Sequence, residues 1–195
     1  MRLLDLLVSL IGLVFLSPIF LIASLVIKFT SPGPILHCGE RVGLNGKLFT
    51  LYKFRTMTVD AATMGPGITA NNDPRITRVG RLLRWTKIDE LPQLINVLKG
   101  DMSLVGPRPE DPRYVALYTE EQRKVLQIKP GITSLASLAY RSEETILAGD
   151  RWEHIYTEQV LPHKLAIEIE YLKKRTFWND LIIIIRTVLA VFRRN

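Results

Sequence analysis

The most apolar part of the chain is its N-terminal segment. Leu3 to Ile27 is almost entirely hydrophobic, with only a few polar or small interruptions. A helix over this stretch is about 37 Å long, which exceeds the roughly 30 Å thickness of the hydrocarbon core of a bilayer. The stretch is too long for a cleaved signal peptide, and Ser31-Pro32-Gly33-Pro34 is not a small-residue cleavage site. We therefore expect a retained membrane segment over residues 1–30.

A break is expected in the middle of this segment, at Ser17-Pro18. Proline removes a backbone donor and clashes with the preceding turn, and the Ser17 hydroxyl can bond a carbonyl that the kink releases. Two topologies remain open: a bent spanning helix, or a helix that turns back and leaves by the leaflet it entered. Arg2 and Lys28 flank the two ends, and the positive-inside tendency mildly favours both ends on the cytoplasmic side.

The C-terminal end is apolar as well. Residues 163–175 and 179–193 have helical patterns, with Asn179 expected to cap the second helix. The apolar run from Trp178 to Phe192 is interrupted by Arg186 and is too short to span a bilayer. It fits a helix at the headgroup level or one packed in the core.

Alternating hydrophobic positions predict one hairpin in the middle of the chain. Ile35–Arg41 and Lys47–Arg55 have strand-like patterns, and Asn45-Gly46 between them is a strong turn signal. Thr63–Pro74 is a loop rich in Gly, Pro and Asn.

One further helix start is expected at Thr119, which forms a capping box with Gln122, and Pro130 would end that helix. No repeat or linker divides the chain. The expected fold is α+β and mostly helical, with the membrane segment (1–30) and a catalytic domain (31–195) integrated in one unit.

Composition narrows the class of protein. The 195 residues are 47% hydrophobic and 23% charged, with a mean hydropathy of +0.14, so the chain is neither disordered nor an ordinary soluble protein. The single cysteine, Cys38, excludes a disulfide framework and, with only three histidines, a Cys/His metal site. Residues 41–100 carry ten basic and four acidic side chains. This excess predicts an anionic partner, and no recognition motif indicates nucleic acid.

Much of this positive charge lies in one periodic run. Its basic members recur at every third residue: Arg75, Arg78, Arg81, Arg84 and Lys87. With apolar residues between them, they predict an amphipathic helix. The basic face would contact either an anionic membrane surface or solvent, and the sequence leaves both open.

Two adjacent acids follow this run. Asp89 is expected at or near a helix N-cap, with Glu90 next to it and Pro92 in the first turn. Acids at helix starts usually serve only as caps, so the pair alone does not establish catalysis. Further on, Arg108 stands between Pro107 and Pro109. Their fixed φ angles present its guanidinium from a stiff backbone, which favours bidentate contact with a phosphate.

Taken together, four ordered motifs resemble the bacterial sugar transferases, the monotopic phosphoglycosyl transferases. The motifs are Lys53-Phe54-Arg55-Thr56-Met57, Thr77-Arg78-Val79-Gly80-Arg81-Leu82-Leu83-Arg84, Asp89-Glu90-Leu91-Pro92-Gln93 and Ser103-Leu104-Val105-Gly106-Pro107-Arg108-Pro109. Ser17-Pro18 and Lys129-Pro130-Gly131-Ile132-Thr133 extend the resemblance over nearly the whole chain, whose length matches the minimal form of the family.

The resemblance implies a monotopic membrane protein with a re-entrant helix–break–helix, interfacial amphipathic helices and an active site at the cytoplasmic face of the bacterial inner membrane. It implies transfer of a sugar-1-phosphate from a UDP-sugar to polyprenol (undecaprenyl) phosphate with release of UMP, a step that initiates surface glycan synthesis such as that of exopolysaccharides. Further expected partners are membrane lipids and a second copy of the chain, as a possible homodimer.

The resemblance also assigns roles. Asp89 would be the nucleophile that forms an aspartyl-phosphosugar intermediate, and Glu90 its partner, with both as ligands of Mg²⁺. The residues expected to bind substrate are all basic: Arg108, Arg84, Arg81, Lys53, Arg55, Arg75 and Arg141. A carboxylate approaching a diphosphate needs such cations, because two like charges at 4 Å repel by about 4 kcal/mol at an effective dielectric near 20.

One motif departs from the family pattern. After Gly131-Ile132-Thr133, the family often continues Gly-Leu-Ala-Gln, whereas this chain has Ser134-Leu135-Ala136-Ser137. Residues 134–141 and 63–74 are where selectivity for sugar or base is expected. The alternatives are a membrane-surface scaffold without catalysis, and a glycosyltransferase that moves the sugar alone and releases UDP.

Overall fold

The computed structural model describes residues 2–64, 73–141, 143–147 and 151–192. Its α-helices are α1 (Arg2–Phe15), α2 (Ser17–Thr30), α3 (Ala61–Met64), α4 (Arg78–Thr86), α5 (Gln93–Lys99), α6 (Pro112–Val115), α7 (Leu135–Ala139), α8 (Glu143–Ile146), α9 (Trp152–Ile155), α10 (Leu161–Lys173) and α11 (Phe177–Phe192). Single turns of 3₁₀ helix are η1 (Leu44–Gly46) and η2 (Ile88–Glu90), η3 (Gln122–Gln127) is a longer one, and η4 (Tyr156–Val160) is a π-helix. The predicted α+β, mostly helical class is confirmed.

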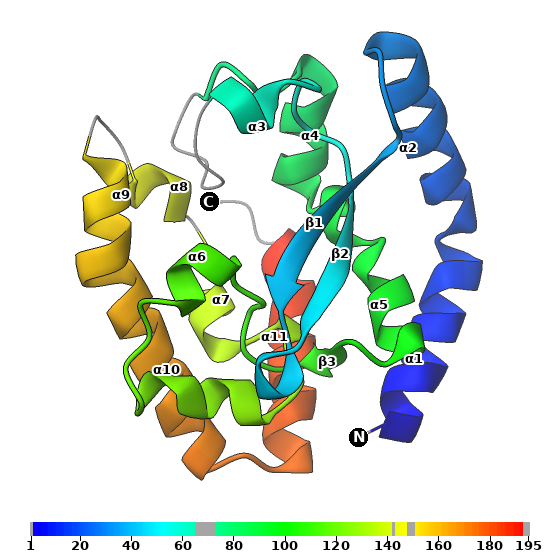
Figure 1. The fold of residues 1–195 in the computed structure, drawn as a ribbon. Coiled ribbons are helices and arrows are strands. Elements are labelled where there is room, and N and C mark those ends of the chain that lie inside the picture. The colour runs from blue at the N-terminus through cyan, green and yellow to red at the C-terminus, as the bar shows by residue number, and fades with distance from the viewer. Residues whose placement is uncertain (1, 65–72, 142, 148–150, 193–195) are drawn as a thin grey trace.

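The helices surround a small central hairpin. In Figure 1, α1 and α2 run along one edge and α9 and α10 along the opposite edge. The hairpin of β1 (Leu36–Val42) and β2 (Leu48–Phe54) crosses between them, with α11 behind it. The largest hydrophobic cluster joins α6, η3, η4 and α10 through residues such as Tyr114, Val125 and Leu165. A second cluster packs Leu94 of α5 and Ile183 of α11 against the short strand β3 (Ser103–Val105).

The predicted break in the N-terminal segment is confirmed. The two helices α1 and α2 meet at Leu16 with a 60° bend, and the Ser17 hydroxyl donates to the Val14 carbonyl oxygen at 2.7 Å. Among the described residues, no single helix is long and apolar enough to cross a bilayer, whereas α1 and α2 together are. Their outer faces expose large apolar side chains, including Phe15 and Phe29.

Polar residues of α1 attach it to the rest of the protein. The carboxylate of Asp5, 3% exposed, accepts hydrogen bonds from the Ser103 hydroxyl at 2.9 Å and the Leu104 amide at 3.1 Å. The Arg2 guanidinium donates to the carbonyl oxygens of Val97 and Leu98, at the end of α5. Therefore α1 has a polar side bound to the protein and an apolar side that faces outward.

The predicted hairpin forms, and a second strand pair accompanies it. Strand β1 (Leu36–Val42) is antiparallel to β2 (Leu48–Phe54), and the turn residue Asn45 has a positive φ of 55°. Strand β3 (Ser103–Val105) runs parallel to β4 (Gly131–Thr133), a pairing that was not predicted. Three-residue strands far apart in sequence leave no periodic signal.

Two close backbone approaches explain glycines of the motifs. A Cβ on Gly80 of α4 would lie 1.9 Å from the Thr56 carbonyl oxygen, so the second motif can cross the first only at a glycine. At the end of β3, a Cβ on Gly106 would lie 2.4 Å from the Lys129 carbonyl oxygen. Motifs that are separate in sequence are thus held in direct backbone contact.

Two predicted helix boundaries need correction. Helix α11 begins before Asn179, and the Thr176 hydroxyl caps it by accepting from the Asn179 backbone amide. The side-chain amide of Asn179 does not act as a cap and donates to the Lys174 carbonyl oxygen. The capping box of Thr119 and Gln122 forms as expected, but it opens the 3₁₀ helix η3 instead of an α-helix. Most of the predicted 63–74 loop lies outside the described residues.

The contacts of Asp5 generate a stability prediction. Replacement Asp5→Ala leaves a buried amide and a buried hydroxyl without their acceptor, and we expect the free energy of unfolding to fall by about 3 kcal/mol. Chemical denaturation in detergent, followed by tryptophan fluorescence, measures this change. Glu120→Ala, at an exposed position, is the control; equal stability of the two variants would contradict the prediction.

Candidate active site

The two candidate acids lie in a tight turn between α4 and α5. The Thr77 hydroxyl caps the start of α4 by accepting from the Gly80 amide at 2.8 Å. At the end of α4, Lys87 adopts a left-handed conformation with φ 58°, an uncommon one for a residue other than glycine. The chain then forms η2, which contains Asp89 and Glu90.

This turn differs from the predicted N-cap. Asp89 lies inside the 3₁₀ turn, and it is Pro92 that directly precedes the first residue of α5, Gln93. The prediction failed because it placed the helix start at the first acid. The reversal at Lys87 supplies the turn instead, so the acids are not caps of α5.

Glu90 is surrounded by donors. Its carboxylate accepts from Arg108 Nη2 at 2.8 Å and Nη1 at 3.3 Å, from Lys53 Nζ at 3.4 Å and from Gln93 Nε2 at 3.3 Å. Burial alone would raise the pKa of Glu90, but the charges of Arg108 and Lys53 outweigh it and hold that pKa well below its usual range. Glu90 is therefore firmly anionic.

Asp89 has the opposite environment. It is 7% exposed, and its Oδ1 has no hydrogen-bond partner among the described residues. Burial and the neighbouring charge of Glu90 raise its pKa, and Lys53, Lys87 and Arg84 oppose this shift only in part. Two adjacent carboxylates whose pKa values are pushed apart are typical of an acid pair with divided roles. The unpartnered, more basic carboxylate is the candidate nucleophile.

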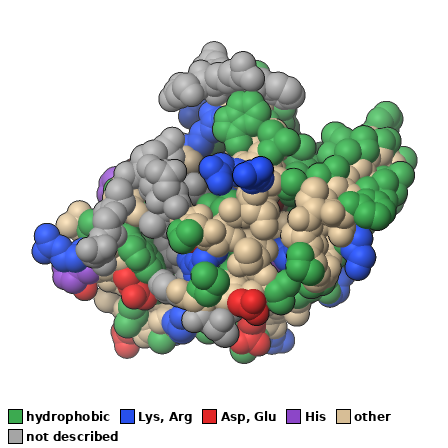
Figure 2. All heavy atoms as spheres, turned by 90° about the horizontal axis from the view of Figure 1, so that it is seen from above, with side chains coloured by type: hydrophobic (Ala, Val, Ile, Leu, Met, Phe, Trp, Pro, Cys, Tyr) green, Lys and Arg blue, Asp and Glu red, His purple; other side chains and the backbone are tan. Residues whose placement is uncertain are grey.

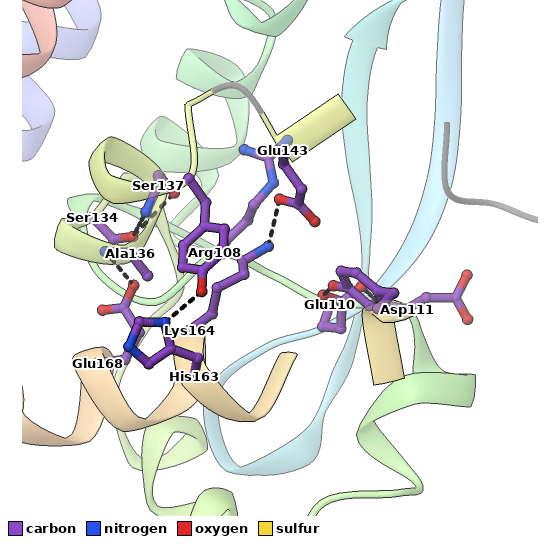
Figure 3. Close-up of polar contacts among 12 residues, drawn as sticks. Arg108, Glu110, Asp111, Ser134, Ala136, Ser137, Glu143, His163, Lys164 and Glu168 are labelled. Atoms are coloured by element: carbon purple, nitrogen blue, oxygen red, sulfur yellow. Dashed lines mark hydrogen bonds and ion pairs between the residues drawn. The ribbon is translucent and has the colours of Figure 1, made fainter. Parts of the chain in front are cut away.

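Arg108 reaches this pair from the loop that follows β3. Glu90 raises the pKa of its guanidinium further, so it stays charged. On its other side Arg108 lies beside Glu143, which is paired with Lys164 of α10 at 2.8 Å (Figure 3). A cavity of about 30 Å³ between this loop and α10 has room for about two waters and none for a sugar or a base.

Some of the predicted binding residues lie next to the acid pair, and others lie elsewhere. Lys53 and Arg108 contact Glu90. The Arg84 Nε donates to the Thr56 hydroxyl at 2.9 Å, and the charge of this guanidinium lowers the pKa of Asp89. Arg81 is exposed on α4, and Arg141 is exposed just beyond α7.

Two predicted binding residues have structural partners. The Arg55 guanidinium donates to the Pro32 carbonyl oxygen, to the Ser31 carbonyl oxygen at 2.9 Å and to the Ser31 hydroxyl at 2.8 Å, so it fixes the chain after α2. Arg75 precedes α4 and is not on its basic face. It pairs with Asp73 at 2.6 Å and donates to the Ala61 carbonyl oxygen.

Two residues at the site were not predicted. Gln93, 1% exposed, donates to Glu90 from one turn further along the chain, a spacing that could have identified it. The positive charge of Lys87 lowers the pKa of both Asp89 and Glu90. It belonged to the predicted basic run, but its left-handed conformation has no sequence signal.

Among the described residues, the acid pair is the candidate site for a metal ion. Within the described part of the chain, no group of three His, Cys, Asp or Glu side chains could hold a metal ion. Mg²⁺ often takes only one or two carboxylates, together with phosphate oxygens and waters. The unpartnered Oδ1 of Asp89, next to Glu90, fits such a site.

The surface near this site is both basic and apolar. Seen from above, hydrophobic side chains cover the edge formed by α2, and Lys and Arg side chains lie beside them (Figure 2). Leu82 and Trp85 of α4 are exposed among its arginines. On α11, Ile183 is buried while Trp178, Ile185 and Val188 are exposed, so this helix packs one face in the core and leaves the other uncovered.

Comparison with known proteins gives consistent matches. A family model described as bacterial sugar transferase matches residues 1–194. The chain is 38% identical over 202 residues to an undecaprenyl-phosphate glucose phosphotransferase of Komagataeibacter xylinus, with 100% of this chain and 36% of the relative covered.

Two other relatives carry related names. A UDP-glucose:undecaprenyl-phosphate glucose-1-phosphate transferase of Caulobacter vibrioides is 39% identical over 193 residues, which cover 96% of this chain and 67% of the relative. An undecaprenyl-phosphate galactose phosphotransferase of Salmonella typhimurium is 37% identical over 213 residues, which cover 100% of this chain and 40% of the relative. The chain thus spans between about a third and two thirds of the length of these relatives.

The environment of Asp89 predicts a gain in stability on its removal. A raised pKa means that the folded state binds the proton more tightly than the unfolded state does, so stability is lost as pH rises above the unfolded-state pKa of about 4. Asp89→Asn lacks this loss, and we expect its free energy of unfolding at pH 8 to exceed that of the native chain by about 1 kcal/mol. Denaturation at pH 4 and pH 8 tests this. A gain that is larger at pH 4 would contradict the assigned sign.

Proposed function

Because the chain belongs to the bacterial sugar transferase family, we propose that it transfers a sugar-1-phosphate from a UDP-sugar to undecaprenyl phosphate and releases UMP. The relatives named above are transferases of this kind. One observation of the structure carries the proposal: Asp89 has a buried carboxylate oxygen without a partner, directly beside Glu90, which Lys53 and Arg108 neutralise.

In the first step, an Asp89 carboxylate oxygen attacks the phosphorus that carries the sugar. The bond from this phosphorus to the oxygen it shares with the second phosphate breaks, and UMP leaves with that oxygen. The product is an aspartyl-phosphosugar. Arg108 and Lys53 already face this point and stabilise the charge that develops on the phosphate oxygens without rearranging.

In the second step, a phosphate oxygen of the lipid attacks the same phosphorus. The bond to Asp89 breaks, the carboxylate is restored, and the sugar is left on a lipid diphosphate. The two displacements allow one site to use a soluble donor and a membrane-bound acceptor in turn. A lipid product of this type starts the synthesis of a surface glycan such as an exopolysaccharide.

We include Mg²⁺ in the proposal on the chemistry of the acid pair. Asp89 and Glu90 would hold it together with diphosphate oxygens, and when bound it offsets the repulsion between the carboxylates and the substrate. Arg108 and Lys53 hold Glu90 charged and in place in its absence.

The proposed location is the cytoplasmic face of the bacterial inner membrane. The bent pair α1 and α2 would enter and leave by one leaflet, since its outer faces are apolar while Arg2 and Asp5 bind the protein. The exposed apolar residues of α4 and α11 would lie at the headgroup level, with the arginines of α4 toward the lipid phosphates.

A covalent adduct tests the chemistry. Incubation of the purified protein with UDP-sugars and Mg²⁺, without lipid acceptor, should release one UMP per chain and add the mass of a phosphosugar to the protein, as measured by intact-protein mass spectrometry. In Asp89→Asn the adduct should be absent and turnover should fall by about 10³-fold or more. Glu120→Gln is the matched control at an exposed acid.

Other products would select another function. Release of UDP would indicate a glycosyltransferase that moves the sugar alone. Normal turnover by Asp89→Asn would exclude the covalent route, and failure of every UDP-sugar to release nucleotide would favour a membrane-surface scaffold.

Thiol labelling tests the topology. In a Cys38→Ser background, Leu3→Cys places a thiol on the exposed side of α1, and Leu117→Cys places one at an exposed position of the catalytic domain. In spheroplasts, a membrane-impermeant maleimide should label neither, and in lysed cells it should label both. Labelling of the Leu3→Cys variant alone in spheroplasts would instead indicate that the segment spans the membrane.

A further inference from the structure

We propose that Asn96 is a positioning residue that holds Lys53 against Glu90. The inference rests on the proposed function, because it assigns a task within the same site. Asn96 lies on α5, one turn beyond Gln93, and is 0% exposed.

The Asn96 side chain takes the place of a neighbouring strand. Strand β2 pairs with β1 along one edge. At its other edge, Asn96 Nδ2 donates to the Thr50 carbonyl oxygen at 2.7 Å, and Asn96 Oδ1 accepts from the Tyr52 amide at 3.1 Å. A carbonyl and the amide two residues later point to the same side of a strand, so one amide side chain satisfies both groups.

These two bonds lie directly next to Lys53. The lysine follows Tyr52 on β2, and its Nζ is 3.4 Å from Glu90 Oε1. Glu90 in turn lies in the turn that leads into α5. Asn96 thus joins the strand that carries the cation to the helix that follows the acid, and it fixes the separation of the two charged groups.

Asn96 is itself held firmly. Its backbone carbonyl oxygen accepts from the backbone amides of Gly100, Asp101 and Met102. Its side-chain Nδ2 also donates to Asp101 Oδ2 at 3.3 Å. Since the side chain is fully buried, water cannot replace it when it is removed. Loss of the amide would leave the edge of β2 unsatisfied beside α5, and the strand would move with Lys53.

The consequence for Lys53 can be measured without any substrate. The Lys53 Nζ is paired with Glu90 Oε1 at 3.4 Å, and an amine held in an ion pair reacts with acylating reagents more slowly than one that has left it. In Asn96→Ala we expect the acylation of Lys53 by acetic anhydride, relative to the other lysines, to rise about five-fold or more, as measured by peptide mass spectrometry.

A control separates this effect from the loss of any side-chain amide that is bonded to the backbone. Asn179→Ala removes a side-chain amide that likewise donates to a backbone carbonyl, that of Lys174, at 2.9 Å. It lies on α11, and Lys53 acylation should remain at the native level. An Asn96→Ala variant with native Lys53 acylation would overturn the proposal.

A double-mutant cycle tests the role in transfer. We expect Asn96→Ala to lower kcat/KM for UMP release by about 10- to 100-fold, because a displacement of about 1 Å has effects of this size. In a Lys53→Met background the same change should cost less than about 2-fold, since the lysine through which it acts is gone. If Asn96→Ala lowers kcat/KM by the same factor in the native and the Lys53→Met backgrounds, Asn96 has a purely structural role and the proposal is overturned. This conclusion does not depend on how far the substitution lowers the Tm.

A second variant covers the case in which Asn96→Ala does not fold. Asn96→Asp keeps the shape and the acceptor for the Tyr52 amide but turns an oxygen toward the Thr50 carbonyl. It should show the same rise in Lys53 acylation, and native acylation would overturn the proposal. If the native chain releases no UMP, the proposed function fails while the acylation experiment still decides the role of Asn96.

Discussion

The neutralisation of Glu90 is the interaction on which the site depends. Two acids stand next to each other in a buried turn, and burial of like charges is costly unless cations accompany them. Lys53 comes from the hairpin and Arg108 from the loop after β3, so elements distant in sequence must meet at one carboxylate. Glu90 takes both cations, and Asp89 is left buried with an unpartnered oxygen. Because both cations pair with Glu90 and neither pairs with Asp89, Glu90 holds the cations in place and Asp89 is the nucleophile in the proposed reaction.

The same arrangement explains how a doubly anionic substrate could be accepted. Arg108 is about one third exposed in its side chain, with Glu90 on one side and the pair of Glu143 and Lys164 on the other. Its guanidinium is therefore fixed before any phosphate arrives, and preorganised charge stabilises a transition state without the cost of reorienting solvent.

The features that sequence predicted are those with local causes. Asn45-Gly46 sets the hairpin turn, Ser17-Pro18 breaks the first helix, and the acid pair lies between a basic run and a proline-flanked arginine. The arginines were harder to assign, because their partners are chosen by tertiary contacts. Arg84 and Arg75 belong to the same periodic run, yet Arg75 pairs with Asp73, while Arg84 donates to the Thr56 hydroxyl and its charge lowers the pKa of Asp89. The pairing of β3 with β4 was missed for a related reason, since two three-residue strands acquire meaning only when they meet.

The first helix links the active site to the proposed membrane position. An acid within an apolar helix is costly in lipid unless it is paired within the protein, and Asp5 is bound to the strand that leads to Arg108. Arg2 is bound to the end of the helix that follows Asp89 and Glu90. Asp5 and Arg2 of α1 are thus bound to elements next to the candidate site, and the other large side chains that α1 exposes are apolar. In the proposed topology, these contacts set the depth of α1 and the height of Asp89 together, so that the nucleophile lies at the level where a lipid phosphate is presented.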